Sequence, residues 1–390
     1  MHAPIDAIVL GLSPTGLYAV RELSRARRRV LGVDDAPACA AHSSAMRAHW
    51  RCTDEEQLLQ RLVQLGMEQA EPPVLVPTSD KYIEFVCRHA AALQTNFHFP
   101  HCYIDGADVL LDKLKFHHLC QRHGVATPGV WEVADRQALA AMAGQIVFPC
   151  ILKPALIHRA RPFLHGEKVL LARTPDELGR LLDSLPNDVG GWLVQEVIPG
   201  AESRITLFGA YVDRGGEVRQ AFTARKLRQY PPGFGSASLV MSETCAETDT
   251  LSRDFLRAIG FRGICGTEFK RDPRDGRLKI IEINPRPTLW FQLCHAAGKR
   301  IVEAAFCDLR GLPAPVEHAQ RNGVRWRYLL KDLASSLFYR RHGNGFVFPR
   351  PDLTAAGARR GRAWAVFDAR DPLPALAEPL VYLRKWWGGR

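Results

Sequence analysis

Glu268–Arg286 reads EFKRDPRDGRLKIIEINPR, and this stretch carries the strongest fold signal of the sequence. Pro273, Asp275 and Gly276 supply turn chemistry between two runs of alternating or β-branched residues. Two strands joined by such a turn form an antiparallel pair. We therefore predict a β-hairpin here.

The second strand of this hairpin predicts a magnesium site. A two-residue period sorts it into two faces, with Lys279, Ile281 and Ile283 on one and Ile280, Glu282 and Asn284 on the other. If Ile281 and Ile283 enter the core, Glu282 and Asn284 project into a cleft that Glu268 also reaches. Carboxylate and amide oxygens suit Mg²⁺ better than zinc. Arg286 adds a planar cation for phosphoryl oxygens. A surface hairpin with solvated charges explains the same pattern.

The composition is that of a globular protein. The 390 residues suffice for two or three domains, and the contents of 46% hydrophobic and 24% charged residues are ordinary. No uninterrupted apolar run reaches the roughly 18 residues of a spanning helix. Ten scattered cysteines without a CxxC pair indicate reduced, buried thiols. The N-terminus reads as a first strand rather than a signal peptide, so we expect a cytoplasmic protein.

The net charge of +11 comes mostly from arginine, in clusters at residues 25–29, at 358–362 and at the C-terminus. Nucleic-acid binding would need cations interleaved with stacking aromatics or a known module, and the sequence has neither, so we expect no nucleic-acid partner. The charge instead suits anionic small substrates, solubility or an anionic membrane surface.

Residues 5–35 predict a βαβ unit and hence a parallel sheet. The turn GLSPTG resembles a dinucleotide-binding fingerprint only loosely, because Ser13 replaces the second glycine, although Asp34 could imitate the ribose-binding acid. We expect the fold without that cofactor. A later strand ends at Asp80, which is either a helix cap, the preferred interpretation, or a ligand-binding residue at a strand end.

Cations recur at the ends of later elements. Lys113 lies in the first turn of a predicted helix, and Lys153 closes an apolar strand. Each is either a snorkelling edge residue or a phosphate ligand. The segment after Lys153 is either a solvated loop or a flap over nucleotide phosphates, with Arg159, Arg161, His165 and Lys168 as its cations.

Taken in order, these motifs resemble the ATP-grasp superfamily of carboxylate–amine ligases, and most closely the branch of D-aspartate ligase and carbamoyl-phosphate-synthase-like enzymes. The motifs are DKLK at Lys113, ILKP at Lys153, QEVIPG at 195–200 and the Glu268–Arg286 hairpin. The implied fold class is α/β (α+β ATP-grasp), with an N-terminal open parallel α/β domain at residues 1–108. A two-lobed ATP-grasp domain follows at 109–311, with lobes at about 109–190 and 191–311, and a small C-terminal extension at 312–390.

The resemblance also implies roles for individual residues. It gives nucleotide contacts to Lys113, Lys153, Lys168, Gln195, Glu196, Val197, Ile198 and Glu202, with the QEVIPG hinge holding the base. It implies that magnesium is bound by Glu268, Glu282 and Asn284. It implies catalytic roles for Lys153, Arg228 and Arg286. Substrate carboxylates would be bound by Arg225, Lys226 and Arg228. Two departures are that Ser203 stands where relatives often carry the ribose acid, and that the flap lacks a glycine run.

The activity implied is ligation of a carboxylate to an amine through an acyl phosphate, with ADP and phosphate released and amino-acid-like substrates. ATP and two Mg²⁺ ions, replaceable by Mn²⁺, are the expected cofactors. Carboxylation, transfer to a non-amine acceptor and a non-catalytic nucleotide-binding protein are the alternatives. We also expect small-molecule partners and a homodimer. The C-terminal YLRKWWGGR either contacts a membrane surface weakly or packs its tryptophans against the core or a second subunit.

Overall fold

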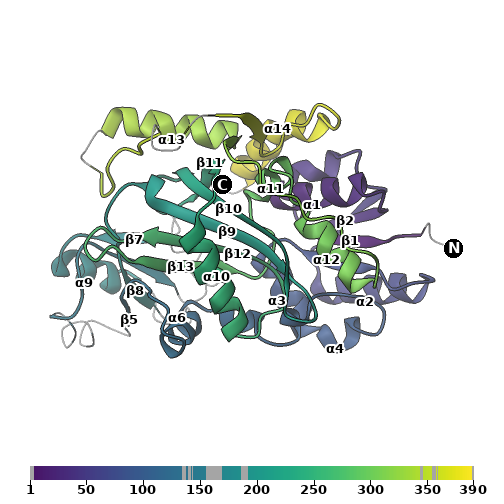
Figure 1. Ribbon diagram of the computed structural model, residues 1–390, viewed down its shortest axis with the longest axis horizontal. Helices are drawn as coiled ribbons and strands as arrows, with labels where there is room; N and C mark the ends of the chain where they lie inside the picture. Colours follow the sequence, from purple (N-terminus) through teal and green to yellow (C-terminus); the bar gives the residue numbers. More distant parts are fainter. Residues whose placement is uncertain are drawn as a thin grey trace.

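The computed structural model describes residues 4–133, 138, 142, 144–154, 169–185, 192–342, 346–353, 357 and 359–388. The described strands form three sheets (Figure 1). Arg159, Arg161, His165 and Lys168 lie outside the described residues, so the predicted flap stays a prediction.

The first sheet is parallel, as predicted. Its strands have the order β3-β2-β1-β4 and are β1 (Ala7–Leu10), β2 (Val30–Asp34), β3 (Ala48–Arg51) and β4 (Val74–Pro77). The helices of this domain are α1 (Pro14–Arg25), α2 (Glu55–Met67), α3 (Asp80–Arg88), α4 (Ala90–Leu93) and α5 (Ala107–Leu111). The βαβ prediction for residues 5–35 is therefore confirmed.

The turn between β1 and α1 is closed by the protein's own groups. A Cβ on Gly16 would lie 1.9 Å from the Gly11 carbonyl oxygen, so only glycine allows this approach of helix to strand. The Asp34 carboxylate accepts hydrogen bonds from the backbone N–H groups of Leu12 at 2.5 Å and Asp35 at 2.8 Å. Asp34 thus holds the turn itself, which accounts for an acid at this place without a dinucleotide.

The second sheet builds a small lobe with its own core. Its strands are β5 (Val130–Glu132), β6 (Cys150–Pro154), β7 (Leu170–Ala172) and β8 (Trp192–Glu196), antiparallel in the order β5-β8-β6-β7. Helix α6 (Lys113–Arg122) precedes the sheet, and α9 (Pro175–Asp183) follows β7. The Thr174 hydroxyl caps α9 by accepting from Glu177 N at 3.2 Å. Because β8 pairs with β5 and β6, this lobe extends to Glu196 rather than ending near 190.

The third sheet is the largest and has the order β13-β12-β9-β10-β11-β14-β15. Its strands are β9 (Ile205–Val212), β10 (Val218–Tyr230), β11 (Ser236–Ser242), β12 (Gly263–Arg271), β13 (Leu278–Asn284), β14 (Val324–Arg327) and β15 (Gly361–Trp364), and its helices are α10 (Ala246–Ala258), α11 (Phe291–Ala296) and α12 (Ile301–Leu309). Strands β12 and β13 are the predicted hairpin.

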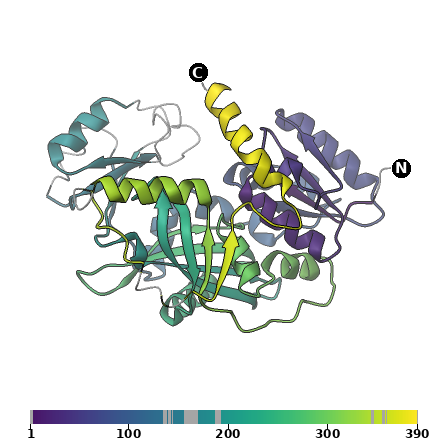
Figure 2. The same cartoon turned by 90° about the horizontal axis from the view of Figure 1, so that it is seen from above.

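The C-terminal extension continues this sheet through β14 and β15. Strand β14 pairs with β11 through residues 325–327. The helix α13 runs Leu329–His342, and α14 runs Leu373–Gly388 with Pro379 inside it. Figure 2 shows the small lobe and the first domain on opposite sides, with α13 and α14 on the near side.

The first domain packs directly on the large sheet. Leu10 of β1 and Ile283 of β13 belong to one buried cluster. The Tyr103 hydroxyl donates to the carbonyl oxygen of Pro285 at 2.9 Å. These contacts bring the carboxyl ends of the parallel strands to the β12–β13 hairpin.

All ten cysteines are free thiols, as their scattered spacing predicted. Among the helices that the structure describes, none has the length and apolar character to cross a bilayer.

Candidate functional site

A β-bulge in β13 decides which side chains of the hairpin reach the cleft. Glu268 pairs with Glu282 across the two strands, but Phe269 pairs with Ile280, which leaves Ile281 as an extra residue. Ile280 and Ile283 are buried in the core, whereas Ile281 is only partly buried. The predicted alternation was therefore wrong before the bulge and right after it, so Lys279 shares the face of Glu282.

The three predicted metal ligands lie together on this hairpin. Glu268 and Glu282 are direct cross-strand partners, and the side chains at such positions lie side by side. The Asn284 amide nitrogen donates to Glu282 Oε1 at 3.0 Å. Two carboxylates and one amide oxygen therefore converge at the end of β13.

Arg286 connects this group to the first domain. Its Nη2 donates to Asn284 Oδ1 at 3.1 Å, and its Nε donates to Asp80 Oδ1 at 2.7 Å. Burial pushes the pKa of Asp80 up, but the charges of Arg286 and Lys113 outweigh it and hold that pKa below its usual value. Asp80 is the first residue of α3 and Ser79 is the cap, so the preferred interpretation of Asp80 as a cap was wrong. The sequence feature that favours the alternative, a ligand-binding residue, is the place of Asp80 at the carboxyl end of a parallel strand.

Two predicted lysines border the same carboxylates. Lys113 begins α6, and its Nζ lies 3.8 Å from Glu282 Oε2. Lys153, at the end of β6, donates to Gln195 Oε1. Burial, reinforced by the nearby Lys113, lowers the pKa of Lys153 to about 7. The site thus holds a lysine that readily changes charge near neutral pH.

Lys226 of β10 completes the group. Its side chain is 2% exposed and forms an ion pair with Glu268. The sequence assigned Lys226 to a substrate carboxylate, but its partner here is a predicted metal ligand. In the part of the chain that the structure describes, Lys113, Lys153, Lys226 and Arg286 thus face Glu268, Glu282 and Asp80.

The predicted base-binding hinge is partly occupied by internal contacts. The Glu196 carboxylate accepts from Gly129 N at 2.9 Å and forms an ion pair with Arg274. The Val197 N–H donates to the Pro149 carbonyl at 3.2 Å, and the Ile198 carbonyl accepts from Lys270 Nζ at 2.7 Å. The Glu196 side chain and the Val197 N–H thus both have partners within the protein, and their contacts with the base stay predictions.

Glu202 takes part in hydrogen bonds within the protein. It is completely buried, and its carboxylate accepts hydrogen bonds from Gln229 N at 3.0 Å, Gly233 N at 2.6 Å and the Tyr339 hydroxyl at 2.8 Å. Burial raises the pKa of Glu202. These hydrogen bonds join the loop after β10 to α13, and the nucleotide contact of Glu202 stays a prediction.

Arg225 and Arg228 are also engaged elsewhere. Arg225 makes a two-pronged ion pair with Glu243, both distances being 2.7 Å, and Arg228 makes one with Asp332 at 2.7 and 2.8 Å. Each guanidinium already has a carboxylate in the geometry that it prefers. The predicted roles of these two arginines in binding substrate carboxylates, and of Arg228 in catalysis, stay predictions.

Lys270 and Phe348 belong to the surroundings of the hinge and were missed. Lys270 lies two residues after Glu268 and thus on the same strand face, a signal that the sequence offered. Burial lowers the pKa of Lys270 to about 7. Its Nζ lies 3.8 Å from the ring centre of Phe348, which clusters with Ile151 and Val197. Nothing in the sequence pattern around Phe348 indicated this position.

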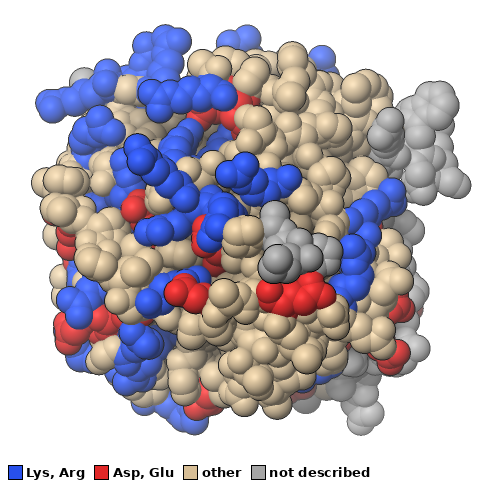
Figure 3. Space-filling view, turned by 90° about the vertical axis from the view of Figure 1, so that its right-hand side faces the viewer, with Lys and Arg blue, Asp and Glu red and all other residues tan. Residues whose placement is uncertain are grey.

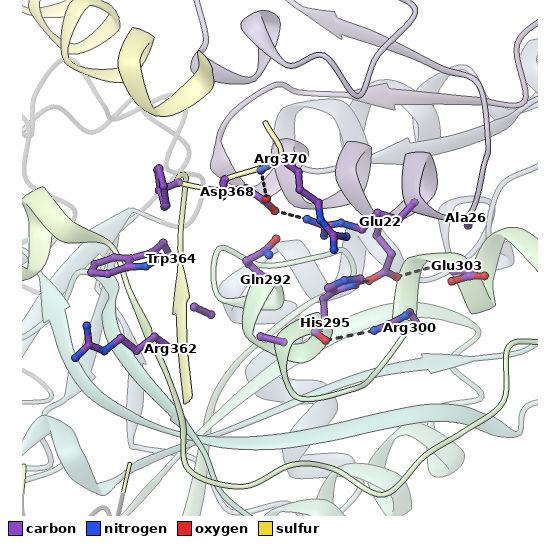
Figure 4. Close-up of a pocket in the computed structure, with 15 residues that line it drawn as sticks. Glu22, Ala26, Gln292, His295, Arg300, Glu303, Arg362, Trp364, Asp368 and Arg370 are labelled. Atoms are coloured by element: carbon purple, nitrogen blue, oxygen red, sulfur yellow. Dashed lines mark hydrogen bonds and ion pairs between the residues drawn. The ribbon is translucent and has the colours of Figure 1, made fainter. Parts of the chain in front are cut away.

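A separate cavity of about 750 Å³ lies where the three predicted domains meet (Figure 4). Its lining includes Glu22 from α1, His295 from α11 and Asp368 from the extension. Glu22 Oε1 accepts from Val302 N at 2.8 Å, and its other oxygen lies 3.3 Å from His295 Nδ1. None of the predicted site residues lines this cavity, and the ion pairs Glu22–His295 and Arg25–Asp368 join charged groups of its lining.

The hairpin group fits a magnesium ion by the chemistry of its donors. Glu268, Glu282 and Asn284 offer hard oxygens from two adjacent strands, and cations stand beside them for phosphate oxygens. No cluster of three or more His, Cys, Asp or Glu suited to a metal occurs among the described residues. The amide oxygen of Asn284 is therefore needed as the third donor.

Solved structures share the fold of this chain. An ADP complex of N5-carboxyaminoimidazole ribonucleotide synthetase superposes with a TM-score of 0.62 at 12% identity, over 80% of this chain and 79% of that chain. The synthetase from Thermus thermophilus gives 0.62 at 18% identity over 79% of each chain. The biotin carboxylase domain of the Hydrogenobacter thermophilus 2-oxoglutarate carboxylase, bound to MgADP and bicarbonate, gives 0.63 at 15% identity, over 83% and 74%. The chain has the ATP-grasp fold.

A D-aspartate ligase of Enterococcus faecium is 25% identical over 242 residues, which cover 59% of this chain and 57% of the ligase. The chain thus spans less than two thirds of the length of that relative. No model of a protein family matches the sequence.

Proposed function

We propose that this chain is an ATP-dependent ligase that activates a carboxylate as an acyl phosphate and joins it to an amine. The observation that carries the proposal is the cross-strand pair Glu268–Glu282, bordered by Lys113, Lys153 and Arg286. The similarity to a D-aspartate ligase supports an amino-acid-like substrate. ADP and phosphate are the expected products.

In this proposal Glu268, Glu282 and Asn284 hold two Mg²⁺ ions, which Mn²⁺ can replace. Metal held there would supply positive charge that neutralises the phosphate oxygens. Lys113, Lys153 and Arg286 bind and orient the phosphate oxygens, and Gln195 fixes the Lys153 ammonium. The Ile198 N–H, which has no hydrogen-bond partner among the described residues, is the donor left at the hinge for the base. Positioning and electrostatics then carry most of the rate acceleration.

The charged residues of the site also position the substrates. Asp80 orients the Arg286 guanidinium from the first domain, so a substrate at the parallel strand ends meets the phosphates beside Arg286. Lys226 holds the Glu268 carboxylate from β10. The chain's own contribution is to keep four cations fixed around charge that develops during the reaction.

The test is ADP release from a panel of amino acids and acidic small molecules, each supplied alone and in pairs. ADP should appear only when a carboxylate and an amine are both present. Release of AMP and pyrophosphate would contradict the acyl-phosphate route.

Carboxylation is the second candidate. One of the similar solved structures is an N5-carboxyaminoimidazole ribonucleotide synthetase, and another is a biotin carboxylase domain in complex with bicarbonate. ADP release that depends on bicarbonate and needs no amine would favour it. ATP binding without turnover across the whole panel would favour a regulatory nucleotide-binding protein. The homodimer, and the weak contact of the C-terminal segment with a membrane surface, are further proposals from the sequence.

A further inference from the structure

The helix α13 exposes a continuous row of leucines. Leu329, Leu330, Leu333 and Leu337 are 46%, 47%, 56% and 47% exposed. Their spacing places them on one face, within about 100° of arc at the helical repeat. The opposite face carries the buried Asp332, Ser335 and Tyr339. The leucines are thus not the packing face of this helix.

The helix α14 also exposes a row of leucines. Leu373, Leu376, Leu380 and Leu383 are 54%, 70%, 60% and 54% exposed, and their spacing of three or four residues also makes one face. The buried side of α14 includes Glu378 and Val381. Isolated exposed leucines are common, but eight on two neighbouring helices of one segment are not.

The charges around these leucines have one sign. Asp332, the acid of α13, is buried and paired with Arg228 and Arg327. Glu378, the acid of α14, is buried and accepts a hydrogen bond from the Tyr328 hydroxyl. Among the described side chains of the two helices no exposed acid remains, while Arg340, Arg341 and His342 are exposed at the end of α13.

The helices α13 and α14 lie on the same side of the molecule. Figure 1 places α13 and α14 along its top edge, and Figure 2, which looks down on that side, shows both helices in front. In Figure 3, Lys and Arg side chains gather over the upper part of the adjoining face, where few Asp or Glu side chains appear. Lys and Arg side chains thus gather on a face that adjoins the side where the two helices lie.

We propose that the leucine faces of α13 and α14 dock on an anionic lipid bilayer surface. Leucines entering the boundary between headgroups and acyl chains lose contact with water, and flanking cations are attracted to anionic headgroups. Charge complementarity favours this partner over a second copy of the chain. Two copies meeting through these faces would bring exposed cations together without an exposed acid on either face.

The experiment is co-sedimentation of the full chain with vesicles of phosphatidylcholine alone or mixed with phosphatidylglycerol. The wild-type protein should sediment with the mixed vesicles, and salt should weaken this binding. Leu376→Glu/Leu380→Glu and Leu333→Glu/Leu337→Glu should each reduce partitioning by at least about tenfold, because a charge replaces an apolar group on the inserted face. Absence of binding to the mixed vesicles would overturn the proposal.

Met67→Glu/Val316→Glu is the matched control, since these side chains are 68% and 72% exposed and lie outside both helices. This variant should bind vesicles within about twofold of wild type, on the scale of a surface change remote from the contact. Equal loss in the control would overturn the assignment to α13 and α14. Light scattering without lipid gives the other decisive outcome. A dimer that both leucine variants abolish, in a protein that binds no vesicles, would identify a second copy as the partner.

Discussion

Two strands of the same sheet, β13 and β10, both present charged residues that the sequence assigned to the active site. In the structure, the charged residues of the two strands have different partners. On β13, Glu282 and Asn284 meet Lys113 from α6, and through Arg286 they meet Asp80 from α3. On β10, Arg225 and Arg228 each meet a single carboxylate, Glu243 and Asp332.

The difference teaches how to separate a site from a structural charge pair. A guanidinium that already has two aligned hydrogen bonds to one carboxylate gains little from a ligand. Groups shared among several elements, with more cations than acids, retain a reason to bind an anion. The β13 group meets this condition and the two β10 arginines do not.

The largest effect is expected when glutamate is replaced by glutamine once in the β13 group and once beside a β10 arginine. Glu282→Gln should lower the turnover of paired-substrate ADP release by at least about 100-fold, because it removes a charge that positions the metal. Glu243→Gln, beside Arg225, should retain turnover within about threefold, on the scale of a partly exposed ion pair. Circular dichroism checks that both variants fold. An equal loss in Glu243→Gln would return Arg225 to the active site.

The second test concerns the structural role of the other β10 arginine. Asp332→Asn should lower the free energy of unfolding by about 2 kcal/mol or more, because Arg228 and Arg327 lose a buried counter-charge. Denaturant titration measures this change. The Michaelis constant for the carboxylate substrate should stay unchanged in the folded variant, and a large increase would show that Arg228 contacts substrate.

The third test measures how ATP binding beside the β13 group depends on pH. The pKa of Lys153, lowered to about 7 by burial, means that the ammonium loses its proton as pH rises above neutrality. Phosphates favour the charged lysine, so ATP affinity should fall above pH 7 by up to about tenfold per pH unit. Calorimetry in buffers of different ionisation enthalpy should detect proton uptake on binding.

Lys153→Arg is the control for this titration, since arginine stays charged over the whole range. Its ATP affinity should not vary with pH in this way. A slope that persists in the variant would assign the titration to Lys270, whose pKa burial also lowers to about 7.

The smallest effect concerns the hinge. Phe348→Ala should raise the dissociation constant for ATP by about threefold, because the ring packs on Lys270, and a cation–π contact of this kind contributes about 0.5–1 kcal/mol. Phe367→Ala, at a half-exposed position away from the hinge, should leave this constant unchanged. Equal constants in wild type and Phe348→Ala would remove Phe348 from the surroundings of the nucleotide.

Local patterns predicted much of the fold. The βαβ unit and the β12–β13 hairpin depend on turn residues and strand periods within a few residues of one another. The bulge at Ile281 escaped the pattern because a strict two-residue period assumes that no residue is inserted.

The sequence by itself determined the order of elements and the identity of the oxygen donors, because residue type and period act over short distances. It could not decide whether Glu202, Arg225 and Arg228 face a ligand, since their partners lie 18 to 137 positions away in the chain. Nor could it place Asp80 beside Arg286, a contact across 206 positions. Only tertiary packing brings such groups together, and the partner that a charge meets there decides whether it supports the fold or remains for chemistry.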